Sequence, residues 1–365
     1  MKVKRGLIFI SILIIISLPV YFFSIGSENN SNEETLNENS SGIITPVYVT
    51  INSHNENNWN INSKNRYFAY RKDLLERLQL IQEYNAKLNW GSDYVVLLAM
   101  KKYETEEILE DTNNKNILQY IIEDFGFSVD PHLHPSEYNY ADIAYLIEQM
   151  DVKSSSVIGG VIVKDCINGE QVFTNWHDTL ELQNNGYIYG KIYPNYKWKP
   201  EILSGAGSTS HVYDDLSSGI WYPGNNEDFY EDQGKGIVLI GQGYDHDATL
   251  VLESNKKELY YEDGAYIKEL VEKIKSGELP SEKMYTANIH IQDKEDISNE
   301  VKTNDALKQV LEELKPYADA GLIKYVTYQE SLEIWKEEYN SEPNKVDISE
   351  FSKYDQILAQ QEKFC

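Results

Sequence analysis

The chain has 365 residues, enough for one large domain or two ordinary ones with a substantial hydrophobic core. Its 33 Lys and Arg residues stand against 59 Asp and Glu residues, which gives a formal net charge of -26. This balance argues against a nucleic acid partner, because binding to phosphate groups needs a clustered basic surface.

The first 26 residues are typical of a membrane-targeting segment. Lys2, Lys4 and Arg5 precede residues 6–25, which carry no charge and could cross ~30 Å of hydrocarbon as a helix. Positive residues before such a run keep the N-terminus in the cytoplasm. We therefore expect residues 1–26 to be an uncleaved transmembrane signal-anchor, with the rest of the chain outside the cell. The alternative is a cleaved signal peptide, which would leave the protein secreted.

The residues after this segment divide into a linker, one domain and a tail. Residues 27–43 are mostly Asn, Ser and Glu, a composition that cannot bury enough apolar surface to fold and predicts a disordered linker. We expect a single folded domain over residues 44–340 and a polar C-terminal tail over 341–365. Cys166 and Cys365 could pair outside the cell, but their spacing does not require a disulfide.

Strand-like and helix-like patterns alternate along the predicted domain. In chain order they predict a strand at 43–51, a helix at 66–88, a strand at 94–100, a helix at 116–125, a short loop or strand end at 130–134, a helix at 141–150, strands at 156–163 and 236–240, a helix at 264–276, a strand at 285–291, a helix at 304–321, a strand at 323–327 and a helix at 328–339. Gly159 and Gly160, in the middle of one predicted strand, indicate that another group approaches closely there.

The alternation indicates an α/β fold with parallel strands, either as an open sheet or as a closed barrel. In such folds catalytic groups gather at the carboxyl ends of the strands. Three predicted strand ends carry histidine with a second polar residue: His54 with Glu56, His132 with His134, and His290 with Asp293. We therefore expect these side chains to meet in one site.

His132 and His134 are the strongest metal-binding signal in the chain. Residues i and i+2 of an extended segment point to the same side, and imidazole is a common ligand of zinc. Two prolines, Pro131 and Pro135, bracket the pair. The alternative is that the two histidines only pack in a proline-flanked turn.

Three short stretches resemble the polysaccharide deacetylase family of the glycoside hydrolase/deacetylase superfamily: VYVTINSHNE at 47–56, DPHLHP at 130–135 and ANIHIQD at 287–293. The resemblance implies a distorted (β/α) barrel as a single domain. The family's first motif ends in Asp-Asp and its second is His-x-x-x-His, whereas this chain has His-Asn-Glu and His-x-His. Residues 54–59 also resemble the His-x-Asp-x-x-Trp start of the retaining alpha-mannosidases, so a glycosidase stays an alternative.

The resemblance implies a hydrolase that removes N-acetyl groups from a cell-envelope or extracellular glycan with the help of a divalent metal, zinc first. His54, His132 and His134 would be the metal ligands. Glu56 would be the base that takes the proton of water, or a further ligand, and His290 the acid that protonates the departing amine. The departure from the Asp-Asp motif keeps a second alternative open, a non-catalytic sugar-binding barrel.

Two tryptophans are candidates for contact with the sugar. Trp198 and Trp221 have ring faces that can stack on a pyranose, and their indole N–H groups can bind a hydroxyl. The glycine-rich stretches lack the lysine and the helix of a phosphate-binding loop, so no nucleotide is expected.

Overall fold

The computed structural model describes residues 45–55, 61, 63–134, 136–168, 170–208, 217–243, 264–292 and 303–347. All of them belong to one compact unit, residues 43–365. No helix within these ranges is long and apolar enough to cross a membrane. The predicted anchor at 1–26 and linker at 27–43 lie outside the described residues.

The first sheet is parallel and is centred on β1 (Val47–Asn55). β13 (Tyr285–Gln292) runs along one edge of β1, and the other edge is shared by β14 (Ile323–Tyr325) and β2 (Leu88–Ser92), with β3 (Ser128–Pro131) next to β2. Val47, Val49 and Ile51 of β1 are 0% exposed in the main hydrophobic core. The sheet therefore has one apolar face, as expected for a strand with a period of two.

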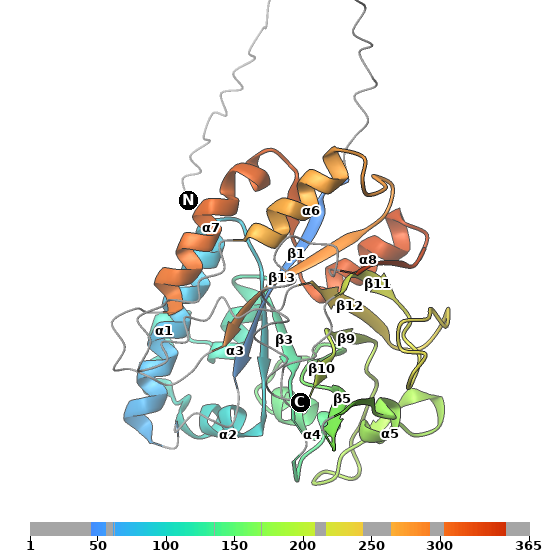
Figure 1. The fold of residues 1–365 in the computed structure, drawn as a ribbon. Coiled ribbons are helices and arrows are strands. Elements are labelled where there is room, and N and C mark those ends of the chain that lie inside the picture. The colour runs from blue at the N-terminus through green and yellow to red at the C-terminus, as the bar shows by residue number, and fades with distance from the viewer. Residues whose placement is uncertain are drawn as a thin grey trace, which may run out of the picture. The chain divides into compact units, whose positions relative to one another are not determined.

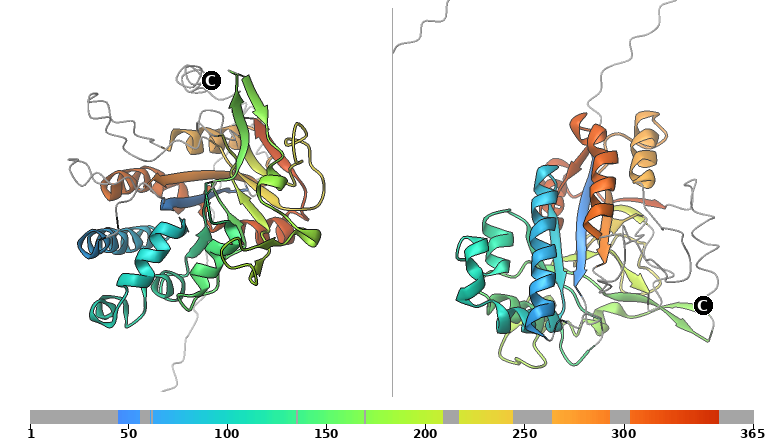
Figure 2. Two further views of the ribbon diagram at one scale, coloured as in Figure 1. Left: turned by 90° about the horizontal axis from the view of Figure 1, so that it is seen from below. Right: turned by 90° about the vertical axis from the view of Figure 1, so that its left-hand side faces the viewer.

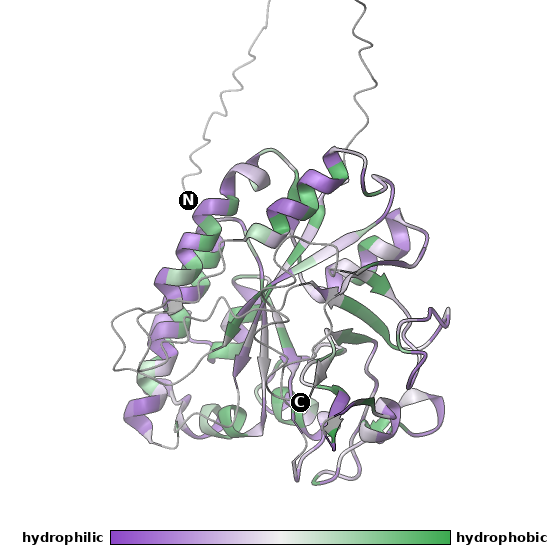
Figure 3. Cartoon of the chain, viewed as in Figure 1, coloured by the Kyte–Doolittle hydropathy of each residue, from purple (hydrophilic) through white to green (hydrophobic). Residues whose placement is uncertain are grey.

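Helices cover the apolar face and connect the parallel strands (Figure 1). They are α1 (Lys64–Glu83), α2 (Tyr94–Tyr103), α3 (Ile117–Glu123), α4 (Tyr140–Glu148), α6 (Ala265–Lys275) and α7 (Thr303–Asp319). α8 (Tyr328–Glu338) packs instead in a second hydrophobic cluster, which contains Tyr48 from the opposite face of β1. The remaining helical segments are a short α5 (Trp176–Thr179) and the 3-10 turns η1 (Glu106–Thr112) and η2 (Asn184–Gly186). α1 and α7 lie side by side. Figure 3 shows hydrophilic and hydrophobic residues alternating along α1, α6 and α7, the pattern of helices with one buried face.

The second sheet has the order β15 (Asn344–Asp347), β11 (Ser217–Trp221), β12 (Val238–Gln242), β9 (Ile202–Ser204) and β4 (Val157–Ile158). β4, β9 and β12 are parallel, whereas β11 pairs antiparallel with both β12 and β15. Smaller ladders join β5 (Ile162–Ile167) to β6 (Glu170–Phe173) and β10 (Gly207–Ser208), and β7 (Ile188–Tyr189) to β8 (Lys197–Trp198). Figure 2 shows β5 and β6 extending from the body as a hairpin.

The two sheets meet along two seams. On one side an isolated parallel bridge joins His132, just after β3, to Gly159, just after β4. On the other side Thr286 of β13 accepts a hydrogen bond from Gly219 N over 2.8 Å and donates to Gly219 O over 2.9 Å. The described ranges form an α/β fold with a parallel sheet, as predicted. Within these ranges no ladder of paired strands joins the two sheets into the closed barrel that the resemblance implied.

Most predicted elements are present within a few residues. The predicted helix at 66–88 ends at Glu83 and is followed by β2, the predicted strand at 156–163 is divided between β4 and β5, and the predicted strand at 94–100 is wrong. Residues 94–100, predicted as a strand, form α2 because Asp93 caps the helix: its carboxylate accepts from the N–H groups of Val95 and Val96. The tail predicted from residue 341 contains a strand, β15, which completes the second sheet, while residues 348–365 lie outside the described part.

Candidate active site

Polar side chains line the face of the first sheet that lies opposite the apolar residues Val47, Val49 and Ile51. Alternate residues of β1, namely Thr50, Asn52 and His54, share this face with Asn288 and His290 of β13. The register sets Thr50 beside Asn288 and Asn52 beside His290. Except for the half-buried His54, these side chains are at most 4% exposed, so the polar groups must find partners within the protein.

Three histidines from three strands meet at the carboxyl end of this face. The rings of His54 and His132 have centroids 3.9 Å apart and are tilted by 37°, and the rings of His54 and His290 are 4.0 Å apart and nearly perpendicular. His132 is 2% exposed and His290 4% exposed. We call His54, His132 and His290 the histidine cluster. The expected meeting of the three strand ends is confirmed for these side chains.

His134 lies at the edge of this cluster. Its ring is 5.5 Å from the ring of His132 and nearly perpendicular to it, and its side chain is half-buried. Glu56 and Asp293, the expected acidic partners of His54 and His290, lie outside the described residues. The roles of Glu56, His134 and the three clustered histidines therefore stay predictions.

Asn52 orients two of the clustered rings. Its Nδ2 lies 3.2 Å from His54 Nε2, and its Oδ1 lies 3.1 Å from His290 Nδ1. Because an amide nitrogen donates and an amide oxygen accepts, His54 accepts at Nε2 and His290 donates from Nδ1. Asn288 donates to Asn52 Oδ1 over 3.0 Å and accepts from the Thr50 hydroxyl over 3.1 Å, which fixes the orientation of both amides.

Sequence reasoning missed Asn52, although a usable signal was present. A polar residue two positions before His54 in a β-branched strand must share the face of that histidine. Its register partner, His290, became visible only when the two strands paired. Asn52 is 3% exposed and its side chain contacts His54 and His290, so its place is within the site.

Gly159 and Gly160 make room for the ring of His132. A Cβ atom built on Gly159 would stand 2.6 Å from His132 Nδ1, and one on Gly160 would stand 2.9 Å from Nε2. Leu133 N donates to Gly159 O over 3.1 Å, and the Tyr140 hydroxyl donates to the same oxygen over 2.9 Å. The close approach predicted at the two glycines is therefore confirmed, and the approaching group is a site histidine.

Asp130 lies two residues before His132 on the same face of β3, and it is 4% exposed. Burial raises the pKa of Asp130 to about 6, although hydrogen bonds from the Ser128 and Ser155 hydroxyls oppose the shift. In the sequence alone this carboxyl group gives no sign of a buried site, because an aspartate before a proline is typical of a turn.

The two tryptophans predicted to bind sugar lie elsewhere. Trp221 in β11 is 2% exposed, and its indole donates to Phe229 O over 3.1 Å. It packs in the hydrophobic core and has no ring face left for a sugar, so the prediction for Trp221 is wrong. Trp198 in β8 is 8% exposed and lines a cavity near the amino ends of the strands, away from the histidine cluster.

The histidine cluster fits a zinc ion by donor type, since imidazole nitrogen is a usual zinc ligand. The positions of the three histidine side chains fit a zinc ion less well than their donor type does. Within the described ranges no three His, Cys, Asp or Glu side chains are positioned around one ion, and the Nε2 lone pair of His54 faces the Asn52 amide. An ion bound by His54 through Nε2 would have to displace that hydrogen bond.

No family model matches the chain, and no curated protein matches it. Several solved structures are similar. A protein from Parabacteroides distasonis, provisionally described as a glycoside hydrolase/deacetylase, shares 12% identity at a TM-score of 0.47, over 80% of this chain and 72% of that one. A protein from Pseudomonas aeruginosa PAO1, provisionally described as a polysaccharide deacetylase, shares 10% identity at a TM-score of 0.43, over 80% and 92%.

A third similar structure is the 4-alpha-glucanotransferase from Thermococcus litoralis, with 13% identity and a TM-score of 0.39 over 79% of this chain. The match covers 38% of the length of that enzyme. TM-scores below 0.5 at such identities do not show that the chain belongs to any of these families.

Proposed function

We propose that the chain is an exported, metal-dependent hydrolase that removes N-acetyl groups from a glycan of the cell envelope or its surroundings. The observation that carries the proposal is the contact of His54 with both His132 and His290 at the carboxyl ends of three parallel strands. Three imidazoles need a reason to share a buried site, because each costs free energy when it is taken from water. Ligation and proton transfer are the two usual reasons.

His54, His132 and His134 would hold the ion, with zinc as the first candidate. When bound, a divalent ion stabilises negative charge on a carbonyl oxygen under attack and lowers the pKa of bound water to ~7. Gly159 and Gly160 keep the His132 ring in place beside His54. The chain thus supplies one rigid imidazole, that of His132, and two that lie nearer the surface, those of His54 and His134.

His290 would act as the general acid. Asn52 Oδ1 holds the hydrogen on Nδ1, so the proton that His290 donates would have to come from Nε2. That proton would pass to the amine nitrogen as the C–N bond breaks. Glu56 would take one proton of the attacking water and His290 would give one to the amine nitrogen, so the immediate products are acetic acid and the free amine. The acid then loses its proton to the amine or to water, which gives acetate.

The N-terminal sequence supports a reaction outside the cell. The apolar run at 6–25 after Lys2, Lys4 and Arg5 would tether the domain to the outer face of the cell membrane, or direct it into the medium if cleaved.

The test combines metal analysis with two product assays on the full-length chain. We expect about one zinc per chain, and acetate release from N-acetylglucosamine oligosaccharides that is lost in His132→Ala. A glycosidase would instead release new reducing ends from the same substrate. A His132→Ala variant that keeps its metal and its acetate release would contradict the proposal.

One observation favours a second candidate, a sugar-binding protein without metal. The hydrogen bond from Asn52 satisfies His54 Nε2 within the protein, and no described group of three ligands surrounds an ion. Absence of metal together with unchanged glycan affinity in His132→Ala would favour this candidate over the hydrolase.

A further inference from the structure

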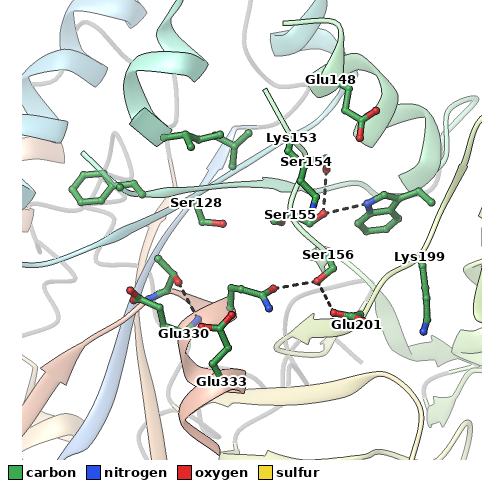
Figure 4. Close-up of a pocket in the computed structure, with 17 residues that line it drawn as sticks. Ser128, Glu148, Lys153, Ser154, Ser155, Ser156, Lys199, Glu201, Glu330 and Glu333 are labelled. Carbon is green, nitrogen blue, oxygen red and sulfur yellow. Dashed lines mark hydrogen bonds between the residues drawn. The ribbon is translucent and has the colours of Figure 1, made fainter. Parts of the chain in front are cut away.

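The seam between β3 and β4 is bonded by the backbone at both of its ends. At the amino end, where Ser155 borders the cavity drawn in Figure 4, Ser155 N donates to Val129 O over 3.2 Å. At the carboxyl end, beside the histidine cluster, Leu133 N donates to Gly159 O over 3.1 Å. The carboxyl end also contains a side-chain contact that the proposed mechanism does not use, from the hydroxyl of Tyr140.

Tyr140 joins the two sides of this carboxyl end. Its hydroxyl donates to Leu133 O over 2.8 Å and to Gly159 O over 2.9 Å, so one hydrogen is shared between two carbonyl oxygens from different strand ends. The side chain of Tyr140 is buried, which shields both contacts from water. A buried carbonyl oxygen that loses its donor costs free energy, so without the hydroxyl the seam would relax until each oxygen finds another partner.

The start of α4 holds Tyr140 in place. Tyr140 is the first residue of this helix, and Asn139 and Asp142 form a capping box around it. Asp142 N donates to Asn139 Oδ1 over 3.2 Å, and Asn139 N donates to Asp142 Oδ2 over 3.0 Å. The tyrosine ring packs in the main hydrophobic core. The hydroxyl is therefore a fixed point to which both strand ends are bonded.

The backbone that Tyr140 binds also carries and confines the ring of His132. Leu133 O belongs to the residue after this histidine, and His132 N donates to Ser92 O over 3.0 Å, so the backbone is bonded on both sides of the ring. A Cβ atom on Gly160 would stand 2.8 Å from Leu133 O and 2.9 Å from His132 Nε2. The backbone at Gly160 thus lies close both to the carbonyl group that Tyr140 binds and to the ring. A seam that opens at Leu133 would therefore also release the ring.

We propose that Tyr140 is a positioning residue for the proposed reaction. Its hydroxyl keeps the seam closed on the His132 ring, and so keeps this ring in its orientation beside His54, 3.9 Å away between centroids. In this role Tyr140 does not touch the substrate and acts through His132. The effect on the rate rests on the proposed function, whereas the effect on the ring rests only on contacts within the chain.

The first test replaces Tyr140 with phenylalanine in the full-length chain. This change removes the hydroxyl and keeps the buried ring, so the fold should be retained. With zinc supplied, we expect kcat for acetate release from the N-acetylglucosamine tetrasaccharide to fall about 10-fold with KM unchanged, as is typical when a residue that orients a metal ligand is lost. An unchanged kcat in Tyr140→Phe would overturn the proposal.

Tyr285→Phe is the matched control for stability. Tyr285 is buried at the amino end of β13, and its hydroxyl also donates to a backbone carbonyl, that of Pro280, over 2.7 Å. Each variant loses a hydrogen bond to the backbone, so both should lower the free energy of unfolding, but only Tyr140→Phe should lower kcat. An equal fall of kcat in Tyr285→Phe would mean that lost stability explains the effect, and it would overturn the proposal.

The ring of His132 gives a second readout, which does not depend on activity. With isotope-labelled histidine, the NMR signal that is missing in His132→Ala identifies His132 among the seven histidines of the chain. Measured without metal, this signal should shift in Tyr140→Phe and stay in place in Tyr285→Phe. A signal that does not move in Tyr140→Phe would overturn the proposal even where acetate release is normal. A shifted signal in a chain that releases no acetate would support the role of Tyr140 in holding the ring and would remove the proposed function alone.

Discussion

The imidazole of His132 lies directly against Gly160, where an added Cβ atom would stand 2.9 Å from His132 Nε2 and 2.8 Å from Leu133 O. Gly160 also has a φ of +77°, a backbone conformation that favours glycine. One residue without a side chain therefore supports both the turn after β4 and the position of a site histidine.

Replacing Gly160 with alanine should displace the His132 ring. We expect loss of acetate release and a decrease of about 2–3 kcal/mol in the free energy of unfolding, measured in urea, from overpacking together with backbone strain. Gly234→Ala is the matched control, since Gly234 has a φ of +66° and nothing within 4 Å of its Cβ position. An equal decrease in the free energy of unfolding in both variants would mean that the His132 ring moves aside without destabilising the fold.

Asn52→Ala should misorient the rings of His54 and His290 with little effect on folding elsewhere. Removal of a residue that orients catalytic or ligating histidines typically costs about 10- to 100-fold in activity or metal affinity. We expect a decrease of that size in the rate of acetate release. Full activity in Asn52→Ala would show that the histidine rings are oriented by other contacts.

The buried ion pair between Glu104 and Arg71 should be a major stabilising contact among α1, α2 and α3. The two side chains are 1% and 5% exposed and 2.8 Å apart, and Glu104 also accepts from Tyr67 and from Ile117 N. Glu104→Gln leaves the Arg71 charge poorly compensated, so we expect a loss of about 3 kcal/mol in urea unfolding.

The exposed pair of Lys64 and Glu107, which is 2.9 Å apart, provides the comparison for this ion pair. Glu107→Gln should change the free energy of unfolding by less than about 1 kcal/mol, because water already solvates both groups. Similar effects of Glu104→Gln and Glu107→Gln would refute the assignment of Glu104 as a structural carboxylate.

Asp142 should hold the segment that follows β7. Its buried carboxylate accepts from the backbone N–H groups of Lys191, Ile192 and Tyr193 over 2.9–3.0 Å. Asp142→Ala leaves these donors unpaired, at about 1–3 kcal/mol for a buried group. Hydrogen exchange at residues 191–193 should accelerate while exchange in β1 stays slow, and unchanged protection at 191–193 would contradict this role.

His177 should make stability depend on pH. Burial lowers the pKa of His177 below 6.5, against the opposing effect of Asp178 and Asp228. At pH values between the lowered pKa of His177 in the folded chain and 6.5, its pKa in the unfolded chain, the unfolded chain binds more protons than the folded one. The contribution of His177 to the free energy of unfolding therefore falls as the pH drops through this range, and it is constant above the range. The difference in unfolding free energy between the wild type and His177→Asn should therefore shrink from pH 7.5 to pH 5.5. A constant difference would exclude the effect.

Local patterns predicted much of the secondary structure, because burial of one face imposes a period on the residues. The strands at β1 and β13, the helices α6, α7 and α8, and the histidines at strand ends could all be read in this way. The prediction failed at 94–100, where a β-branched run looks like a strand and a single capping aspartate makes it a helix.

The sequence by itself determined which residues could do chemistry: the histidines of three strand ends, and two glycines that signal a close approach. Only the tertiary structure decided which of them meet. Strand register brought Asn52 beside His290, long-range packing buried Trp221, and the meeting of two sheets set His132 against Gly159 and Gly160. These outcomes depend on contacts between residues up to 238 positions apart, and no local period in the chain encodes such contacts.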